Sequence, residues 1–231
     1  MLFISLSCKK EVSSPSLNNV TNPVDSTKVV KLDTTVVKDV EGNSYKILKI
    51  GNQFWLAENL KTFKYNDGTL INLIVSDSLW ITDTLGAVCH YNNVSENSKI
   101  YGAMYNWYAV KTNKLCPSGW KVPSSSDWDT LSNFLGGDQI SGSKLKEVGT
   151  QLWSTSNENV TNEFGFTALP TGTRNQFGFF SQGVMTYWWS TYDDGYDGLS
   201  ASVRGVYHSF DVLANQGLLK TTGLPVRCIK K

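Results

Sequence analysis

The segment 187–198, YWWSTYDDGYDG, places aromatic rings beside carboxylates on a glycine-containing turn. Exposed aromatic rings can stack against the apolar faces of sugars, and carboxylate oxygens can accept hydrogen bonds from hydroxyls or bind calcium. Two plainer interpretations remain open: in an alternating strand one tryptophan points into the core, and the aspartates can form a merely hydrated turn. If these side chains are exposed, six residues of the segment are predicted to bind a ligand: Trp188, Trp189, Asp193, Asp194, Tyr196 and Asp197.

Three further polar side chains in the C-terminal half complete the candidate set. Arg174 and Asn175 follow the stretch LPTG, and Arg204 lies in the stretch ASVRGV. Arginine donates several hydrogen bonds and asparagine both donates and accepts them, which are the properties that a polar ligand requires.

Signatures of catalysis and of metal binding are absent from the sequence. It contains no His-Glu-x-x-His, Cys-x-x-Cys or Gly-x-Ser-x-Gly motif, no phosphate-binding loop and no dinucleotide fingerprint. Cys89 and His90 are adjacent, so in a strand they point to opposite faces and do not pair as nucleophile and base. Glu158 and Glu163 are on a predicted loop, which does not fix the carboxylate separation that a hydrolase needs. We therefore expect a protein that is not an enzyme and has no cofactor, with calcium as the one ion that remains open.

The N-terminal residues indicate export and lipid attachment. The run MLFISLSC is apolar up to Cys8, far shorter than the roughly 20 residues of a membrane span. It is similar to the end of a lipoprotein signal, in which Cys8 would carry the lipid, although no basic residue precedes it. The alternative is a hydrophobic N-terminus that is buried in the fold.

A flexible tether is predicted to connect this anchor to one folded domain. Residues 9–35 are rich in Ser, Thr, Asn and Pro, and they have too few large apolar side chains to offset the entropy lost on folding. We therefore expect three parts: a truncated signal at 1–8, a tether at 9–35 and a domain at 36–231.

Two helices are predicted in the first half of that domain. In residues 101–110, YGAMYNWYAV, apolar side chains recur at three- and four-residue spacing. In residues 127–135 the apolar stripe consists of Trp128, Leu131, Phe134 and Leu135. Ser126 is the expected N-cap, and Gly136-Gly137 ends the helix. Residues 142–149 are expected to form at most two helical turns.

Short antiparallel strands and long loops are predicted elsewhere. The turn signals at 41–43 and 51–52 flank strand-prone runs and indicate a hairpin. Further strand candidates are GFTALPTGTR, YWWSTY, ASVRGVYHSF and GLPVRCIK, which follow the helices and are separated by Gly-rich turns. Helices followed by a region of strands and loops are typical of the α+β class.

The composition does not favour nucleic acid as a partner and is typical of an extracellular domain. The 231 residues include 21 basic and 20 acidic side chains, so the sequence lacks the basic excess typical of nucleic-acid-binding domains. Eight Trp, ten Tyr, ten Phe and nineteen Gly suit a loop-rich extracellular fold with an aromatic core.

Six stretches together resemble the Fibrobacter succinogenes major paralogous domain, a family of secreted and lipid-anchored bacterial proteins. They are VEGNSYKILKIGNQFWLAENLKT, YGAMYNWYAV, LCPSGWKVPSSSDWDTL, GFTALPTGTR, YWWST and LPVRCIK, in the expected order. The later blocks are in turn similar to the C-type-lectin-like fold of formylglycine-generating enzymes and of variable receptor domains. This second resemblance rests on Val122-Pro123 with Trp128 and on Val226-Arg227-Cys228.

The resemblance implies a disulfide between Cys116 and Cys228, which would join the end of the first helix to the last strand. It leaves Cys89 as a buried free thiol, although a rearranged pairing is the alternative. It also implies a structural role for Arg227. The activity of formylglycine-generating enzymes is not carried over, because it requires a reactive cysteine pair and two of the three cysteines beyond Cys8 are assigned to the disulfide.

In lectin-like folds a rigid scaffold supports variable loops that bind the ligand. The resemblance therefore implies that loops between Gly165 and Tyr207 form one exposed face. The chain lacks the Glu-Pro-Asn, Gln-Pro-Asp and Trp-Asn-Asp triplets of calcium-dependent lectins. We expect a lipoprotein of the bacterial outer membrane that recognises a glycan. The alternatives are a protein-binding or surface-assembly module and, less favoured, a hydrolase.

Overall fold

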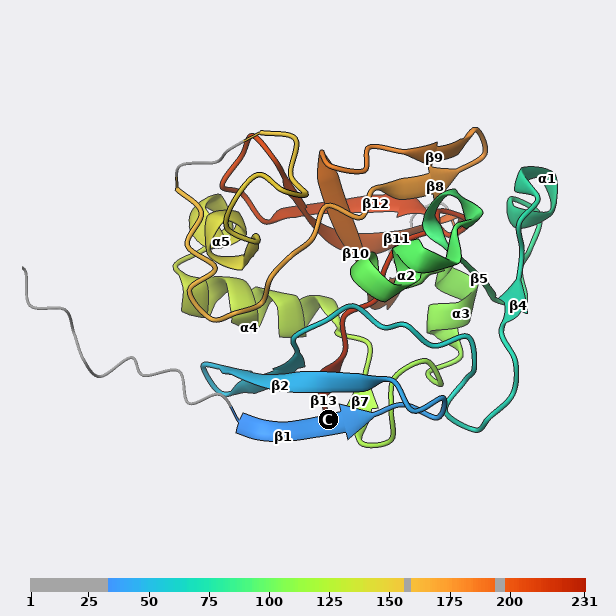
Figure 1. The fold of residues 1–231 in the computed structure, drawn as a ribbon, viewed down its shortest axis with the longest axis horizontal. Coiled ribbons are helices and arrows are strands. Elements are labelled where there is room, and N and C mark those ends of the chain that lie inside the picture. The colour runs from blue at the N-terminus through green and yellow to red at the C-terminus, as the bar shows by residue number, and fades with distance from the viewer. Residues whose placement is uncertain (1–32, 156–158, 194–197) are drawn as a thin grey trace, which may run out of the picture.

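The structure of the protein is a computed structural model that describes residues 33–155, 159–193 and 198–231. Within these residues it has an α+β fold, with short helices packed among small and mainly antiparallel sheets (Figure 1). The predicted α+β class is therefore confirmed. No helix of the described residues is long and apolar enough to cross a lipid bilayer.

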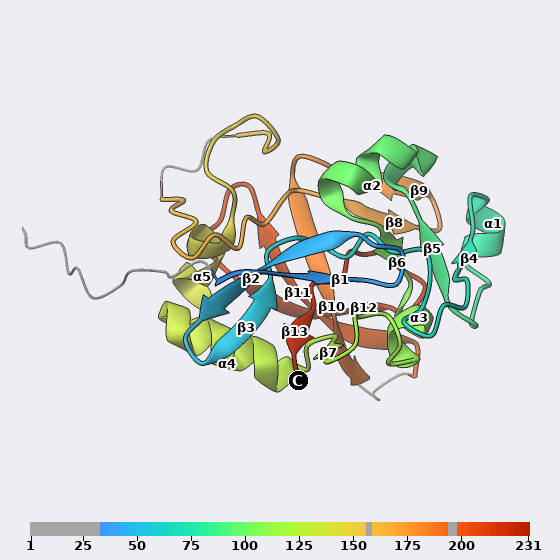
Figure 2. The ribbon, with the colours of Figure 1, turned by 60° about the horizontal axis from the view of Figure 1, so that its bottom comes forward.

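A five-stranded sheet contains both the first and the last strand of the domain. Its strands lie in the order β1 (Asp33–Lys38), β2 (Ser44–Ile50), β3 (Gln53–Leu56), β13 (Ile229–Lys230) and β7 (Trp120–Lys121). The predicted hairpin turns are present, because one turn separates β1 from β2 and the next separates β2 from β3. Figure 2 shows β13 between β3 and β7, so the last strand of the chain lies inside the sheet.

A second sheet has three antiparallel strands, β10 (Met185–Asp193), β11 (Ser200–Tyr207) and β12 (Ala214–Leu219). In this register Arg204 of β11 faces Trp188 of β10 on one side and Asn215 of β12 on the other. The smaller sheets consist of β4 (Asn72–Leu73), β5 (Ala87–Cys89) and β6 (Met104–Tyr105), and of β8 (Thr173–Asn175) with β9 (Gly178–Phe180).

The described helices are short. They are α1 (Asp77–Trp80), the 3-10 helix η1 (Tyr91–Asn93), α2 (Ser95–Tyr101), α3 (Trp107–Lys111), α4 (Ser125–Leu135) and α5 (Asp138–Leu145). The two predicted helices were thus too few, and α5 begins four residues before the helical turns expected at 142–149.

The helix predicted over residues 101–110 is wrong. Helix α2 ends at Tyr101, and Gly102 has a φ of 84°, which continues no right-handed helix. The chain then forms β6, where the Tyr105 amide donates to the carbonyl of Leu224 at 2.8 Å. Helix α3 begins only at Trp107. A pairing with a segment far along the chain therefore overrides the local periodicity.

Helix α4 forms as the local sequence predicts, with two differences. Its N-cap is Ser124 rather than Ser126, and Ser124 and Asp127 form a capping box in which each side chain accepts from the other's amide. Gly136 ends the helix in the left-handed conformation. Phe134, which was expected in the buried stripe, is 50% exposed.

The core is divided into two main clusters by the sheet of β10 and β11. One cluster packs α4 against that sheet and against β2 and β3, and it includes Trp55, Trp128 and Trp188. The other lies on the opposite face and includes Trp189, Cys116 and Cys228. Cys116 and Cys228 form the predicted disulfide, with Cα atoms 6.0 Å apart, and Cys89 is a buried free thiol as expected.

Candidate functional site

The two tryptophans predicted to bind a ligand are fully buried. Trp188 and Trp189 are each 0% exposed, and they point to opposite faces of β10. Their indole N–H groups donate to Asn59 Oδ1 and to the Tyr105 carbonyl, both at 2.8 Å. The opposite-face interpretation is therefore correct, but the prediction that either ring binds a ligand is wrong, because neither ring has an open face.

Arg174 is also a core residue. Its guanidinium is 0% exposed and lies 4.4 Å from the ring of Trp80. It donates to the Asp77 carboxylate at 2.7 Å and to the carbonyls of residues 74 and 75. Asn175 accepts from the Phe177 amide at 2.8 Å and so fixes the turn between β8 and β9. The prediction that Arg174 contacts a ligand is wrong, because protein atoms occupy its donors and cover its faces.

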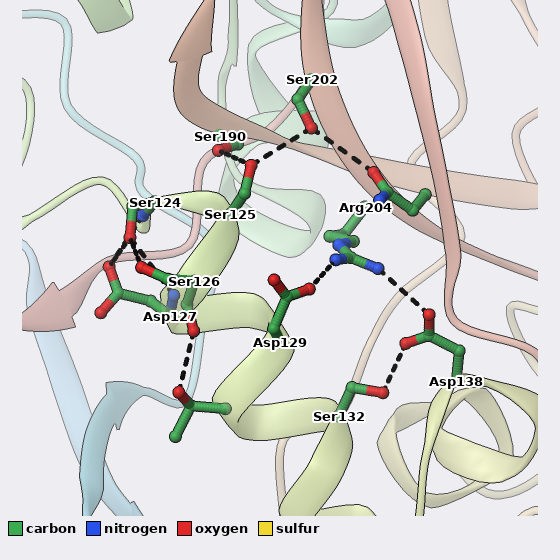
Figure 3. Close-up of polar contacts among 12 residues, drawn as sticks. Ser124, Ser125, Ser126, Asp127, Asp129, Ser132, Asp138, Ser190, Ser202 and Arg204 are labelled. Atoms are coloured by element: carbon green, nitrogen blue, oxygen red, sulfur yellow. Dashed lines mark hydrogen bonds and ion pairs between the residues drawn. The ribbon is translucent and has the colours of Figure 1, made fainter. Parts of the chain in front are cut away.

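Arg204 joins the sheet to two helices. It is 2% exposed, and its guanidinium bridges Asp129 of α4 and Asp138 of α5. Figure 3 shows the guanidinium pointing between these two carboxylates, with Ser132 donating to Asp138 from the neighbouring turn. Arg204 is therefore an anchor beneath the surface, and its predicted direct contact with a ligand is wrong.

The acidic part of the predicted site is only partly described. Asp193 accepts from the ammonium of Lys220, at 2.9 Å to Oδ2. Lys220 is almost fully buried and also donates to the Gly198 carbonyl. This lysine therefore fixes one end of the segment. Asp194, Tyr196 and Asp197 lie outside the described residues.

A polar groove lies next to this segment, where the sheet of β10–β12 extends past the first turn of α4. Its volume is about 380 Å³. Six residues line it: Ser125, Tyr192, Ser202, Asn215, Gln216 and Gly217. They come from α4 and from all three strands of the sheet, so the groove depends on rigid elements rather than on loops alone.

The hydroxyls of the groove form a loosely bonded chain. Ser125 Oγ is 3.3 Å from Ser190 Oγ and 3.5 Å from Ser202 Oγ (Figure 3). Ser202 Oγ is 3.5 Å from Asn215 Oδ1. Hydroxyl hydrogen bonds are usually about 2.7–2.8 Å long, so these contacts are weak. Ser190 is buried and does not line the groove, but the hydroxyls of Ser125 and Ser202 do, and they can rotate toward a ligand at little cost.

Tyr192 supplies the aromatic surface of the groove. Its side chain is 55% exposed, whereas the tryptophans three and four residues before it are buried. The register of β10 against β11 shifts between Trp189 and Asp193, and the Tyr192 amide donates to Ser190 Oγ at 3.2 Å. This irregularity turns the strand outward at its end and explains why the exposed ring is Tyr192.

Sequence reasoning missed the groove because its residues come from four separate segments. The strand register brings Ser202 opposite Gly217 and Arg204 opposite Asn215. The one local signal was the polar pair Asn215-Gln216 within a predicted loop. Tyr192 lies within the segment 187–198, but the prediction assigned ligand binding to the larger rings of Trp188 and Trp189 instead.

The start of α4 forms one wall of the groove, and its charges are compensated within the protein. Burial alone would raise the pKa of the Asp127 carboxyl, but hydrogen bonds from Lys121 and Ser124 outweigh burial and lower the pKa. Lys121 Nζ is 2.7 Å from Asp127 Oδ2. The capping box already uses the amides of Ser124 and Asp127, and the groups of this wall that line the groove include the Ser125 hydroxyl.

Comparison with known families identifies the domain. A model of the Fibrobacter succinogenes major domain matches residues 48–230. The chain belongs to this family. Searches of curated proteins and of solved structures found no match. The six sequence blocks that carried the resemblance thus predicted the family correctly.

The major domain has no metal cluster among its described residues, since no three Asp, Glu, His or Cys side chains gather there. Its free thiol is unreactive at neutral pH, because burial raises the pKa of Cys89 to about 12. The His90 ring is within 2.7 Å of Ser98 Oγ, and burial lowers its pKa.

Proposed function

We propose that this chain is a lipid-anchored cell-surface protein that recognises a glycan in the polar groove, without catalysis. The proposal treats the domain as C-type-lectin-like. The internal position of β13, the disulfide between Cys116 and Cys228 and the helix α4 beside the sheet of β10–β12 support that comparison.

One observation carries the proposal: an exposed aromatic ring stands beside a row of hydroxyl and amide groups in a single groove. Tyr192 offers a ring against which the apolar face of a sugar can stack. Ser125, Ser202 and Asn215 can donate to and accept from sugar hydroxyls. A concave site with a few directed polar groups is typical of small-ligand binding.

The anchor and the location belong to the same proposal. Cys8 follows an apolar run and would carry the lipid after signal cleavage. The tether predicted at 9–35 is shorter than expected, because β1 begins at Asp33. Its remaining residues, 9–32, lie outside the described residues, as does Cys8, and they would hold the domain away from the bacterial outer membrane. Such an arrangement presents the groove to glycans outside the cell or in the periplasm.

A glycan array tests the proposed function directly. The soluble protein, from residue 30 onward, is applied with calcium and with EDTA, and the array is repeated with the variant Tyr192→Ala. We expect saturable binding that weakens about fivefold in the variant, since a lost stacking contact is worth about 1 kcal/mol. Phe210→Ala is the matched control, because Phe210 is 60% exposed but lies outside the groove.

The outcomes separate the possible sites. Weakening by Tyr192→Ala and not by Phe210→Ala supports the groove. Sensitivity to EDTA would add calcium to the site, with Asp193, Asp194 and Asp197 as the carboxylates to substitute next. A blank array from folded protein would contradict the glycan proposal.

A protein-binding function is the second candidate, and exposed apolar side chains on another edge favour it. Leu73 of β4, Leu79 of α1 and Val75 between them are each more than half exposed, and Phe177 in the turn between β8 and β9 is 77% exposed. Arg174 ties these two segments together through Asp77. If the array is blank, Leu79→Ser and Phe177→Ser are the substitutions with which to test a protein partner.

A further inference from the structure

A second cavity lies on a different part of the domain, between β2, the segment after β3, α2 and residues 163–169. We call it the apolar pocket. Its volume is about 350 Å³. Most of its wall is hydrocarbon, contributed by Leu48, Ala57, Ile100, Phe164 and Leu169. None of these residues lines the polar groove.

Arg227 lies at the base of the apolar pocket and is only 1% exposed. Its Nε donates to Asn59 Oδ1 at 3.0 Å, and its Nη1 donates to three main-chain carbonyls, with the Phe166 carbonyl at 2.7 Å. Nη2 has no hydrogen-bond partner among the described residues. The guanidinium also stacks on the Phe166 ring at 4.2 Å. The role of Arg227 as a structural contact is therefore confirmed, but one of its donor atoms is unused.

The protein provides no hydrogen-bonded carboxylate for this cation. Arg174 and Arg204, which are equally buried, each donate to a carboxylate. The four acceptors of Arg227 are neutral oxygens instead. Burying a charge without a counter-charge is unfavourable. Burial lowers the pKa of Arg227 to about 9 and Glu58 opposes that shift, so the side chain is a cation at neutral pH.

The two carboxylates at the pocket have partners of their own. Glu58 and Glu163 both line the pocket. Glu58 accepts from the Lys46 amide at 3.0 Å, and Glu163 lies 3.6 Å from Lys144 Nζ. Lys144 lies outside the lining, so two cations, Lys46 and Arg227, face these two carboxylates. An anion would therefore be held by the open Nη2 position of Arg227 and not by a net positive charge of the lining.

We propose that the apolar pocket binds a small carboxylate with an apolar tail. The carboxylate oxygen accepts from Nη2 of Arg227, and the tail packs against Leu48, Phe164 and Leu169. Charge-assisted hydrogen bonds to arginine are the stronger kind, and the hydrocarbon wall keeps water from competing with them. This site is separate from the polar groove and does not depend on the proposed glycan binding.

Hexanoate is the probe that tests this proposal. It is titrated into the folded protein, and the heat of binding and the tryptophan fluorescence are measured. Trp188 reports on the site because its ring lies 5.9 Å from the guanidinium carbon of Arg227. We expect saturable binding with a Kd on the order of 1 mM, as befits so small a ligand. Hexanamide, which has the same shape and no charge, should bind about tenfold more weakly. Acetate, which lacks the tail, should not saturate.

Two matched variants locate the binding. Ile100→Glu places a negative charge at the pocket, whereas Ile140→Glu makes the same change on α5, and the two side chains are similarly exposed at 54% and 44%. We expect hexanoate affinity to fall at least tenfold in the first variant only, and Tyr192→Ala to have no effect. No saturable hexanoate binding, equal affinities for hexanoate and hexanamide, or equal losses in both Glu variants would each overturn the proposal.

Discussion

Three arginines, Arg174, Arg204 and Arg227, are among the largest fully buried side chains of the protein. Each joins segments far apart in the sequence; the Arg174–Asp77 pair, for example, is separated by 97 residues. From sequence alone Arg174 and Arg204 were predicted on the ligand face, because charged residues are mostly exposed. Nothing local identified their carboxylate partners. Arg227 was predicted correctly only through the resemblance of its strand to a known fold.

The bridge from Arg204 to Asp129 and Asp138 should be strongly cooperative. Either Asp→Asn change alone leaves one carboxylate to compensate the buried cation, so we expect each single variant to lose less than about 1 kcal/mol. The double variant leaves the cation without a counter-charge and should lose about 3 kcal/mol, more than the sum of the two. Urea unfolding of the four proteins measures the coupling. Additive losses would contradict the shared bridge.

At the scale of elements, α4 was predictable because its signals are local: a serine cap, an apolar stripe and a terminal glycine. The periodic segment 101–110 was mispredicted because its fate depends on a partner more than 100 residues later, the Leu224 bridge to β6. The groove could not be predicted for the same reason. The strand register that brings Ser202 and Asn215 together cannot be deduced from either segment alone.

The capping box of α4 should make stability depend on acid pH. The pKa of Asp127 is lowered in the folded protein, so its carboxylate stabilises the fold above its unfolded value of about 3.9 and loses that effect as the pH falls below it. Asp127→Asn should cost about 1 kcal/mol at neutral pH. It should also flatten the decline in unfolding free energy below about pH 4.

Urea unfolding between neutral pH and the acid range tests this effect. Thr130→Ala is the control on the same helix, since it removes an exposed hydroxyl that donates to the Ser126 carbonyl and carries no charge. An unchanged acid slope in Asp127→Asn would assign the acid sensitivity to other carboxyls.

At the scale of the molecule, the disulfide closes most of the domain into one loop. Cys116 and Cys228 are 112 residues apart. A chain-entropy estimate for a loop of this length is about 4–5 kcal/mol of stability. The strand order was not predictable from sequence, because β13 pairs with β3 and β7, which both lie more than 100 residues before it.

Removing the disulfide should therefore lower the free energy of unfolding by about 4 kcal/mol, measured with urea on the reduced protein or on Cys116→Ser/Cys228→Ser. Cys89→Ala, which keeps the bond, should respond to reductant as the parent protein does. Equal stability with and without the bond would show that the unfolded chain is already constrained by other means.

The position of β13 also determines when the five-stranded sheet can be completed during translation. Its two residues, Ile229 and Lys230, occupy the place between β3 and β7, although every other strand of that sheet has left the ribosome more than 100 residues earlier. Chains are made from the N-terminus and domains usually fold as units. The sheet therefore has a gap between β3 and β7 until translation reaches residue 230. The hydrogen bonds that join these two strands through β13 form only after this last strand has been made.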